Sequence, residues 1–240
     1  NGNDIFAGTS TNGIYLSTNQ GINWIQTAMN GGSITAILIN GNVIMAGTSN
    51  GVYRSSNYGQ NWNLTNLSNK FVNGMAISGN YVCAGTIQSG VYISTDNGIG
   101  WTQTALNDKI VFAVGISGSN TLATVSGSGI WLSTNNGQNW TQTSTVSNFR
   151  AITVFGNNVF AGALSSGIYL STNNGVNWTQ TSLNSGSIYS IALNGNNIYA
   201  GSTPGVYMSS NFGQNWNLTG LYASPVLSLA SSGSYLLAGL

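Results

Sequence analysis

The sequence carries almost no charge. Its 240 residues include four lysines or arginines and three aspartates, and they contain neither histidine nor glutamate. The net charge of +1 provides neither a basic track for nucleic-acid phosphates nor an acidic surface. We therefore expect no nucleic-acid partner, and we expect hydroxyl and amide groups to solvate the surface in place of charges.

Long hydrophobic runs and paired cysteines are missing as well. No apolar run approaches the roughly 18 residues that a membrane helix needs, so the sequence predicts no membrane insertion. The single cysteine, Cys83, cannot form an internal disulfide, and its setting YVCAG is typical of a small buried hydrophobe in a strand. Because 41% of the residues are hydrophobic and the aromatics are regularly spaced, the sequence nevertheless predicts a folded chain.

These absences exclude several kinds of catalysis. Without histidine there is no Ser-His or Cys-His nucleophile, and a metal centre built from His, Cys or Glu is excluded too. A glycosidase needs two carboxyl groups flanking the scissile bond. Asp4 lies near the N-terminus, Asp96 lies in a turn and Asp108 is beside Lys109, so no pair is credible. Carboxylates are also too few to favour calcium. We predict no enzyme, no cofactor and no metal site.

What the sequence does contain is a repeat. Six segments share the form Ser-x-Asn/Asp-x-Gly-x-x-Trp, and their tryptophans are 38 or 39 residues apart. The segments are 17–24 (STNQGINW), 55–62 (SSNYGQNW), 94–101 (STDNGIGW), 133–140 (STNNGQNW), 171–178 (STNNGVNW) and 209–216 (SSNFGQNW). This period is close to that of a four-stranded propeller blade.

Four strand-like runs fill each period. In the second repeat they are residues 33–39, 43–49, 51–56 and 61–65, with a hairpin signal at Asn40-Gly41-Asn42 and a small pair, Ala46-Gly47, where neighbouring backbones would crowd. Frequent glycine and β-branched alternation argue against a helix-pair repeat. We predict an all-β fold, a six-bladed β-propeller of four-stranded antiparallel blades, with residues 1–240 as a single domain.

The repeats are permuted at the chain ends. The sequence begins at the second strand of a repeat and ends with a first strand followed by another second strand. A six-bladed ring can close if the C-terminal first strand pairs with the N-terminal strands, which leaves one second strand over. Three alternatives stay open: DIFAGTS or YLLAGL is displaced, the chain is a segment of a longer array, or the extra edge pairs with another molecule.

The repeated turn resembles the Asp-box, or BNR repeat, S-x-D-x-G-x-x-W. Asp-boxes occur in sialidases, sortilin-like receptors, some glycoside hydrolases and the photosystem-assembly propellers, and the resemblance covers essentially the whole chain. It implies that each turn joins the third and fourth strands of a blade, on the side away from the active site. Five of the six boxes carry Asn in place of Asp. Because these families share the turn and differ in activity, the resemblance implies a fold and no particular function.

Physical chemistry assigns the turn residues a structural role. The side-chain oxygen at the third position can accept hydrogen bonds from backbone N–H groups of its own turn, the glycine can adopt a left-handed conformation, and the tryptophan ring can lie between blades. We expect these roles for Asn19, Asn57, Asp96, Asn135, Asn173, Asn211, Trp24, Trp62, Trp101, Trp140, Trp178 and Trp216. Asp96 is therefore interpreted as a variant cap and not as a catalytic residue.

The resemblance also implies a test for sialidase activity. Sialidases use an arginine cluster, a tyrosine nucleophile and an acidic partner. Only Arg54 and Arg150 are present, so a clamp of three arginines cannot form.

Propeller ligands usually bind where the loops between repeats gather with the loops between second and third strands. The loops between repeats hold nearly half of the charges, and they vary more than the turns do. Their candidate ligand-binding residues are Lys70, Phe71, Asp108, Lys109, Phe149 and Tyr222. Stacking of these aromatics on a sugar is weighed against the plainer interpretation that they cap blade junctions. Trp131, which replaces the tyrosine of the other repeats, is interpreted as a repacked blade edge, with a ligand platform as the alternative.

Three functions stay open. The leading hypothesis is a non-catalytic extracellular propeller that serves as a structural or protein-interaction module of a secreted or surface assembly, in a bacterium. The second is a multivalent carbohydrate-binding lectin with equivalent shallow pockets between blades. The third is a subunit that self-associates through its surplus terminal strand. The expected partner is accordingly a protein, a glycan or a second copy of the chain.

Overall fold

The protein is built from β-strands joined by tight turns. A computed structural model describes residues 4–222, 225–233 and 235–240, and every regular element in that part of the chain is a β-strand. None of the described residues belongs to a helix long and apolar enough to cross a membrane. The predicted all-β class is confirmed.

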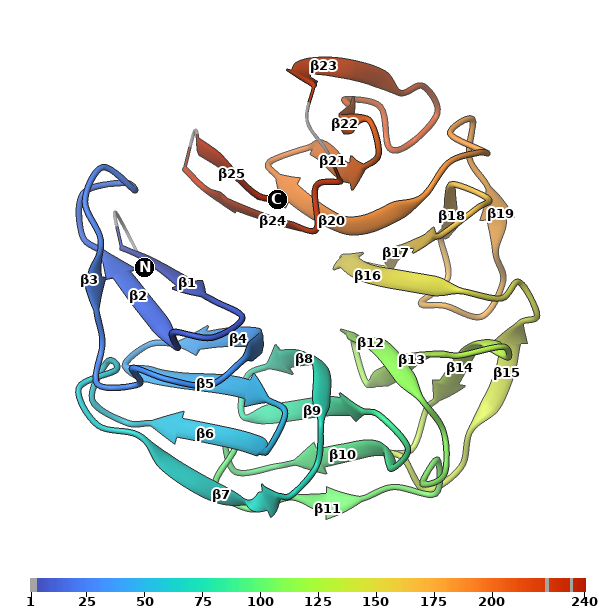
Figure 1. The fold of residues 1–240 in the computed structure, drawn as a ribbon. Helices are drawn as coiled ribbons and strands as arrows, with labels where there is room; N and C mark the ends of the chain where they lie inside the picture. The colour runs from blue at the N-terminus through green and yellow to red at the C-terminus, as the bar shows by residue number, and fades with distance from the viewer. Residues whose placement is uncertain (1–3, 223–224, 234) are drawn as a thin grey trace. The chain divides into compact units, whose positions relative to one another are not determined.

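The chain divides into two compact units, residues 1–114 and 115–240. The first unit contains three sheets whose strands follow one another in the sequence and pair antiparallel (Figure 1). Its strands are β1 (Ile5–Gly8), β2 (Ile14–Ser17) and β3 (Ile25–Gln26), then β4 (Ile34–Asn40), β5 (Val43–Thr48), β6 (Gly51–Ser55) and β7 (Asn63–Ser68), then β8 (Val72–Ser78), β9 (Tyr81–Thr86), β10 (Gly90–Ser94) and β11 (Thr102–Gln103). The prediction of a single domain stays a prediction.

The second unit repeats the same plan. The strand β12 (Val111–Ser117) runs across the boundary and opens a four-stranded sheet, two further four-stranded sheets follow, and a two-stranded sheet ends the chain. The remaining strands are β13 (Asn120–Val125), β14 (Gly129–Ser133), β15 (Thr141–Ser144), β16 (Phe149–Phe155), β17 (Asn158–Ala163), β18 (Ile168–Ser171), β19 (Thr179–Gln180), β20 (Ile188–Asn194), β21 (Asn197–Ser202), β22 (Gly205–Ser209), β23 (Asn217–Tyr222), β24 (Ser228–Ser232) and β25 (Tyr235–Gly239).

The connections lie where the sequence pattern places them. In the second sheet β4 pairs with β5 so that Asn40 lies opposite Val43, and Gly41 in the turn has a φ of 59°. The third and fourth strands, β6 and β7, flank the repeated turn at 55–62. Each four-stranded sheet therefore has the strand order of a propeller blade.

Glycine lies where one sheet approaches the next. A Cβ atom on Gly47 would be 2.9 Å from Cγ1 of Val72, and one on Gly85 would be 2.5 Å from Cγ1 of Val111. The same crowding recurs at Gly162, where a Cβ atom would be 2.5 Å from Cγ2 of Ile188. A larger residue at these positions would push away the first strand of the following sheet, so the close approach expected at Ala46-Gly47 is present.

The core lies between successive sheets. In one cluster Met45 and Leu67 of the second sheet pack with Val82 and Trp101 of the third. The first strands of these sheets, β4 and β8, lie side by side (Figure 1). Each sheet thus buries its apolar face against a neighbour, which is the physical reason why such repeats stack.

The two chain ends form smaller sheets. At the N-terminus β1 pairs with β2 and β2 with β3, while near the C-terminus β24 pairs with β25. The trailing first and second strands predicted from the sequence therefore pair with each other. Closure of a ring through these strands stays a prediction.

Candidate functional site

Each repeated turn is closed by its serine and its third residue. In the turn at 171–178 the hydroxyl of Ser171 donates to Oδ1 of Asn173 (2.9 Å) and accepts from the N–H of Gly175 (2.9 Å). The oxygen of Asn173 also accepts from the N–H of Asn177 (2.9 Å). The two serine bonds occur in all six turns, and all six serines are buried. The sequence interpretation overlooked this serine, although its recurrence was visible.

Two consecutive residues of each turn adopt the left-handed conformation. Besides the glycine, whose φ is 88° at Gly175, the residue before it has a positive φ, 57° at Asn174. In four turns the indole N–H donates to the carbonyl oxygen of the glycine at 3.1–3.2 Å. The polar side chains of the turn therefore hydrogen-bond largely within the turn itself.

Asp96 accepts from the serine hydroxyl and from the N–H four residues later, as its asparagine counterparts do. It also accepts from the N–H three residues later, which in the asparagine turns donates to a backbone carbonyl. Its carboxylate accepts from the Gly100 N–H (2.8 Å), the Ser94 hydroxyl (2.7 Å) and the Ile99 N–H (3.1 Å). These bonds, that from Gly100 first, lower the pKa of Asp96 below its usual value. The side chain is consequently held as an anion, whereas a general acid needs a raised pKa.

The loops between repeats meet the loops between second and third strands. The N–H of Asn69 donates to the carbonyl of Asn50, and that of Gly90 donates to the carbonyl of Lys109. Four of the predicted ligand-binding residues, Lys70, Phe71, Asp108 and Lys109, lie in these loops. Phe71 is 37% exposed, and Asp108 forms an exposed ion pair with Lys109 at 3.2 Å. The expected gathering of the two loop classes is present within each of these repeats.

The ligand-binding interpretation of Phe149 is wrong, because its side chain is buried in a core cluster, as the plainer interpretation of packing at a junction has it. It lies in β16 with only 1% of its surface exposed and packs edge-to-face on Tyr169, with ring centroids 5.4 Å apart. Its ring packs in the core because Phe149 is the first residue of β16, the first strand of its sheet. Tyr222 ends β23, and its side chain lies outside the described residues.

The other reactive side chains are buried or hydrogen-bonded within the fold. The hydroxyl of Tyr58 donates to Asp4 (2.8 Å), and burial followed by this bond raises the pKa of Tyr58 to about 12. Burial likewise raises the pKa of the Cys83 thiol to about 12. The guanidinium of Arg54 donates to the carbonyl of Asn97 (2.9 Å). Within the described chain no group of three His, Cys, Asp or Glu residues is placed to hold a metal.

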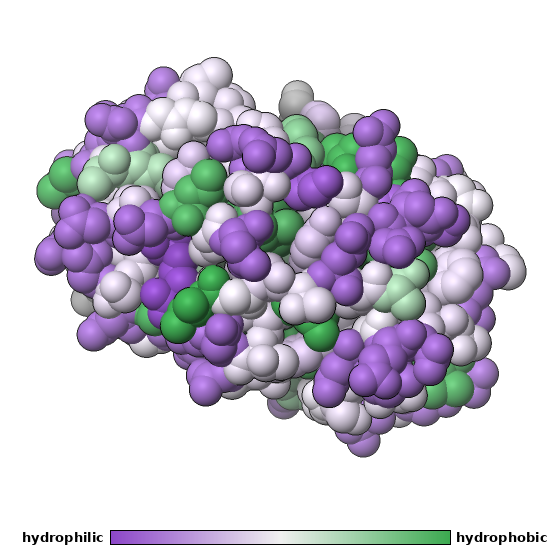
Figure 2. All heavy atoms as spheres, turned by 90° about the horizontal axis from the view of Figure 1, so that it is seen from below, coloured by the Kyte–Doolittle hydropathy of each residue, from purple (hydrophilic) through white to green (hydrophobic). Residues whose placement is uncertain are grey.

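The surface is polar without being charged. Hydrophilic residues cover most of the face in Figure 2, and apolar residues appear among them as scattered spots. Three exposed apolar residues follow the glycine of a repeated turn, namely Ile22, Ile99 and Val176, with 77%, 62% and 46% exposure. They alternate along the chain with glutamine in the other three turns, a pattern that was readable in the sequence.

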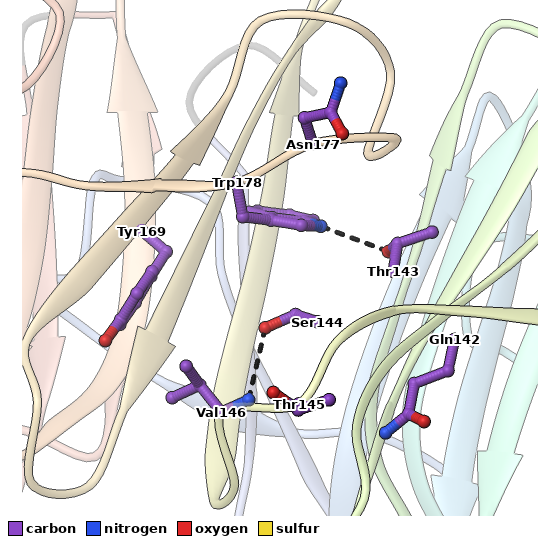
Figure 3. Close-up of a pocket in the computed structure, with 8 residues that line it drawn as sticks. All are labelled: Gln142, Thr143, Ser144, Thr145, Val146, Tyr169, Asn177 and Trp178. Atoms are coloured by element: carbon purple, nitrogen blue, oxygen red, sulfur yellow. Dashed lines mark hydrogen bonds between the residues drawn. The ribbon is translucent and has the colours of Figure 1, made fainter.

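One pocket lies between the sheets β12–β15 and β16–β19. Its volume is about 380 Å³, and Figure 3 shows Trp178 and Tyr169 on one side, with Val146 below. The indole N–H of Trp178 donates to Oγ1 of Thr143 at 3.1 Å (Figure 3). The remaining lining residues are Gln142, Ser144, Thr145 and Asn177.

A second pocket occupies the matching junction in the first unit. It has a volume of about 360 Å³ and is lined by Tyr53 and Trp62, which hold the places of Tyr169 and Trp178 in the repeat. The loop at 28–33 and residues 48–50 complete it. Neither pocket contains a residue proposed as a ligand contact from the sequence.

Comparison with solved structures identifies the fold. No model of a known protein family and no curated protein sequence matches the chain. Among solved structures, YCF48 from Cyanidioschyzon merolae matches with a TM-score of 0.72 and 16% identity, over 98% of this chain and 88% of its own. The fold is that of a six-bladed β-propeller. The predicted fold class is confirmed.

Two further propellers show the range of proteins with this fold. An ancestral GH74 enzyme matches with a TM-score of 0.71 and 21% identity, over 90% of this chain and 37% of its own. YCF48 in complex with a D1 peptide matches with a TM-score of 0.67 and 16% identity, over 90% of this chain and 77% of its own. Identities this low show the fold alone, so membership of the Asp-box families stays a prediction.

Proposed function

We propose that the chain is a non-catalytic propeller that acts as a structural or protein-interaction module of a secreted or bacterial surface assembly. The observation that carries the proposal is the state of its titratable side chains. Asp96 is held as an anion by its turn, while the hydroxyl of Tyr58 and the thiol of Cys83 have pKa values raised to about 12. A general acid, a phenolate nucleophile and a thiolate nucleophile would each need the opposite shift.

The turn residues support this proposal because they act as caps. In six closely similar turns the third residue accepts from the N–H four residues later, with Asp96 in the role that five asparagines have elsewhere. Partner recognition then falls to the loops between repeats, where Lys70, Phe71, Asp108 and Lys109 lie. A YCF48 propeller bound to a D1 peptide shows that this fold can hold a protein segment.

Catalysis can be tested directly. We expect no turnover of a sialoside or of a β-glucan above the background rate. Turnover that is abolished by D96N or by D108N would overturn the proposal, because those substitutions remove the carboxylates without changing the size of the side chain.

The interaction surface can be tested with two phenylalanines of equal exposure. Phe71 lies in a loop between repeats and Phe212 in a repeated turn, and both are 37% exposed. A photo-crosslinking amino acid at position 71 should capture a defined protein partner from the source cell envelope, and one at position 212 should not. Equal capture from both positions would contradict recognition by the loops between repeats.

A further inference from the structure

One long apolar side chain recurs at the junction between two sheets. Met29 packs against Tyr53 and Trp62 in the first unit. Leu67 does so against Tyr92 and Trp101, and in the second unit Leu183 packs with Tyr207 and Trp216. Each of the three follows the tryptophan of its own repeat by five residues.

The junction between the sheets β12–β15 and β16–β19 is filled differently. Its apolar residue is Val146, six residues after Trp140, while the fifth position is taken by the exposed Thr145. The N–H of Val146 donates to Oγ of Ser144 (3.3 Å), as the N–H of Leu106 does to Oγ1 of Thr104 (3.3 Å) in another repeat. Val146 therefore holds the position of the longer residue with a shorter side chain, and it lines the pocket at this junction.

The walls of this pocket have a mixed but uncharged chemistry. The rings of Trp178 and Tyr169 provide apolar surface (Figure 3), and hydroxyl or amide groups of Gln142, Ser144 and Asn177 lie at the other walls and the rim. No carboxylate, ammonium or guanidinium lines it. The indole N–H is already given to Thr143 and to the carbonyl of Gly175, so the indole offers its ring to a ligand and not its donor.

Gln142 has more freedom to bond a ligand than its counterparts. The side-chain nitrogens of Gln26, Gln103 and Gln180 each donate to two backbone carbonyls, one in the loop between second and third strands and one in the following loop. The shorter loop after Gln142 changes this arrangement, and the bond that remains goes to the carbonyl of Ser128 (2.5 Å). Within the described residues the Gln142 amide thus makes one of the two bonds that its counterparts make, which leaves an amide hydrogen that a ligand could use.

We propose that this pocket binds the ring of an uncharged pyranose sugar. The C–H face of such a ring matches the aromatic surfaces, and its hydroxyl groups match the mixed donors and acceptors of Gln142, Ser144 and Asn177. A volume of about 380 Å³ lies in the range of small-molecule pockets. A charged sugar would find no counter-charge. The proposal does not rest on the protein-interaction role, because the residues that line the pocket include none of the four loop residues proposed for partner recognition.

The test uses the whole chain and a blocking substitution. Methyl glycosides of glucose, galactose, mannose and N-acetylglucosamine are titrated by ligand-observed NMR, with the methyl glycoside of N-acetylneuraminic acid and a hexaproline peptide as comparators. T145W places a large ring on the rim at an exposed position. T141W makes the same change at an exposed threonine of β15 outside the lining. We expect at least one neutral glycoside to bind, T145W to weaken it about tenfold, and T141W to leave it within about twofold.

Each other outcome overturns the inference. A folded wild-type chain that binds none of the neutral glycosides excludes the ligand class. Binding that is equal in T145W and T141W excludes the pocket. Preference for the neuraminic glycoside contradicts an uncharged ligand, and hexaproline binding that only T145W removes would assign the pocket to a proline-rich peptide. Among positive results, a gain with tetrasaccharides would distinguish a polysaccharide chain from a terminal sugar as the natural source.

Discussion

The serine of each repeated turn joins the two halves of the turn through one buried hydroxyl. It donates to the side chain two residues later and accepts from the glycine N–H four residues later, as Ser133 does with Asn135 (3.1 Å) and Gly137 (2.8 Å). Asparagine suffices at the third position because its amide oxygen accepts as a carboxylate does. A single aspartate among five asparagines then changes the pH response and keeps the bonds to the serine hydroxyl and to the N–H four residues later.

That difference predicts how stability depends on pH. The folded pKa of Asp96 is lowered, so its stabilising contribution is complete above the unfolded pKa of about 3.9 and is lost as the pH falls through the folded value. We expect D96N to unfold at nearly the wild-type denaturant concentration near pH 7 and to lose less stability than wild type on acidification. Chemical denaturation near pH 7 and at a pH below the unfolded pKa measures this. The substitution N135D should add the same acid sensitivity to another turn. Parallel pH profiles for wild type and D96N would contradict the assignment.

Thr143 and Thr181 each follow the tryptophan of their own repeat by three residues. We expect their substitution to change stability in opposite directions. Oγ1 of Thr143 accepts the indole N–H of Trp178, whereas Oγ1 of Thr181 is buried and has no hydrogen-bond partner within the described chain. T181V should therefore raise the free energy of unfolding by about 1 kcal/mol, and T143V should lower it by about 1 kcal/mol. Urea unfolding of both variants measures the difference. A loss of stability in both would show that the Thr181 hydroxyl is satisfied.

At the scale of the element, the left-handed glycine holds the turn against the neighbouring sheet. Gly175 has a φ of 88°, and a Cβ atom there would lie 2.2 Å from Cδ2 of Leu122. Gly195, in the hairpin between β20 and β21, has a φ of 59° but open space around it. Substitutions at these two positions therefore distinguish the cost of a left-handed backbone from the cost of steric overlap.

We expect G195A to lower the free energy of unfolding by about 1–2 kcal/mol, the cost of a left-handed alanine. G175A should lower it by a further 1–3 kcal/mol or so, because Leu122 must also move. Thermal and urea unfolding of the pair measures the difference. Equal destabilisation would mean that the turn can shift away from Leu122 at little cost.

At the scale of the element, the sequence predicted the positions of some side chains and not of others. The hairpin at Gly41 and the close approach at Gly47 followed from local residue chemistry and were predicted. Phe149 was expected in a loop and lies in a buried strand, because the loop before β16 is one residue shorter than in the other repeats. Local patterns do not reveal a shift of one residue at the start of a strand.

At the scale of the whole molecule, the scarcity of charge predicts insensitivity to salt. The chain has a net charge of +1, and the Asp108–Lys109 pair is exposed, so screening has little to weaken. We expect the melting temperature to change by less than about 2 °C between about 20 mM and about 500 mM sodium chloride. Differential scanning calorimetry measures this, with sodium sulfate as a control for ion-specific effects. A chloride-dependent shift of many degrees would indicate a bound ion.

The sequence by itself determined the repeat, the all-β class, the turn chemistry and the small stock of titratable groups. It did so because a period of 38 or 39 residues, the Ser-x-Asn-x-Gly-x-x-Trp spacing and the composition are local properties of the chain. Only the tertiary structure decided that Phe149 is buried and that Val146, Tyr169 and Trp178 enclose a pocket with Gln142 on its wall. Those features depend on how the residues of one sheet meet those of the next, and the volume left between two side chains cannot be read from either alone.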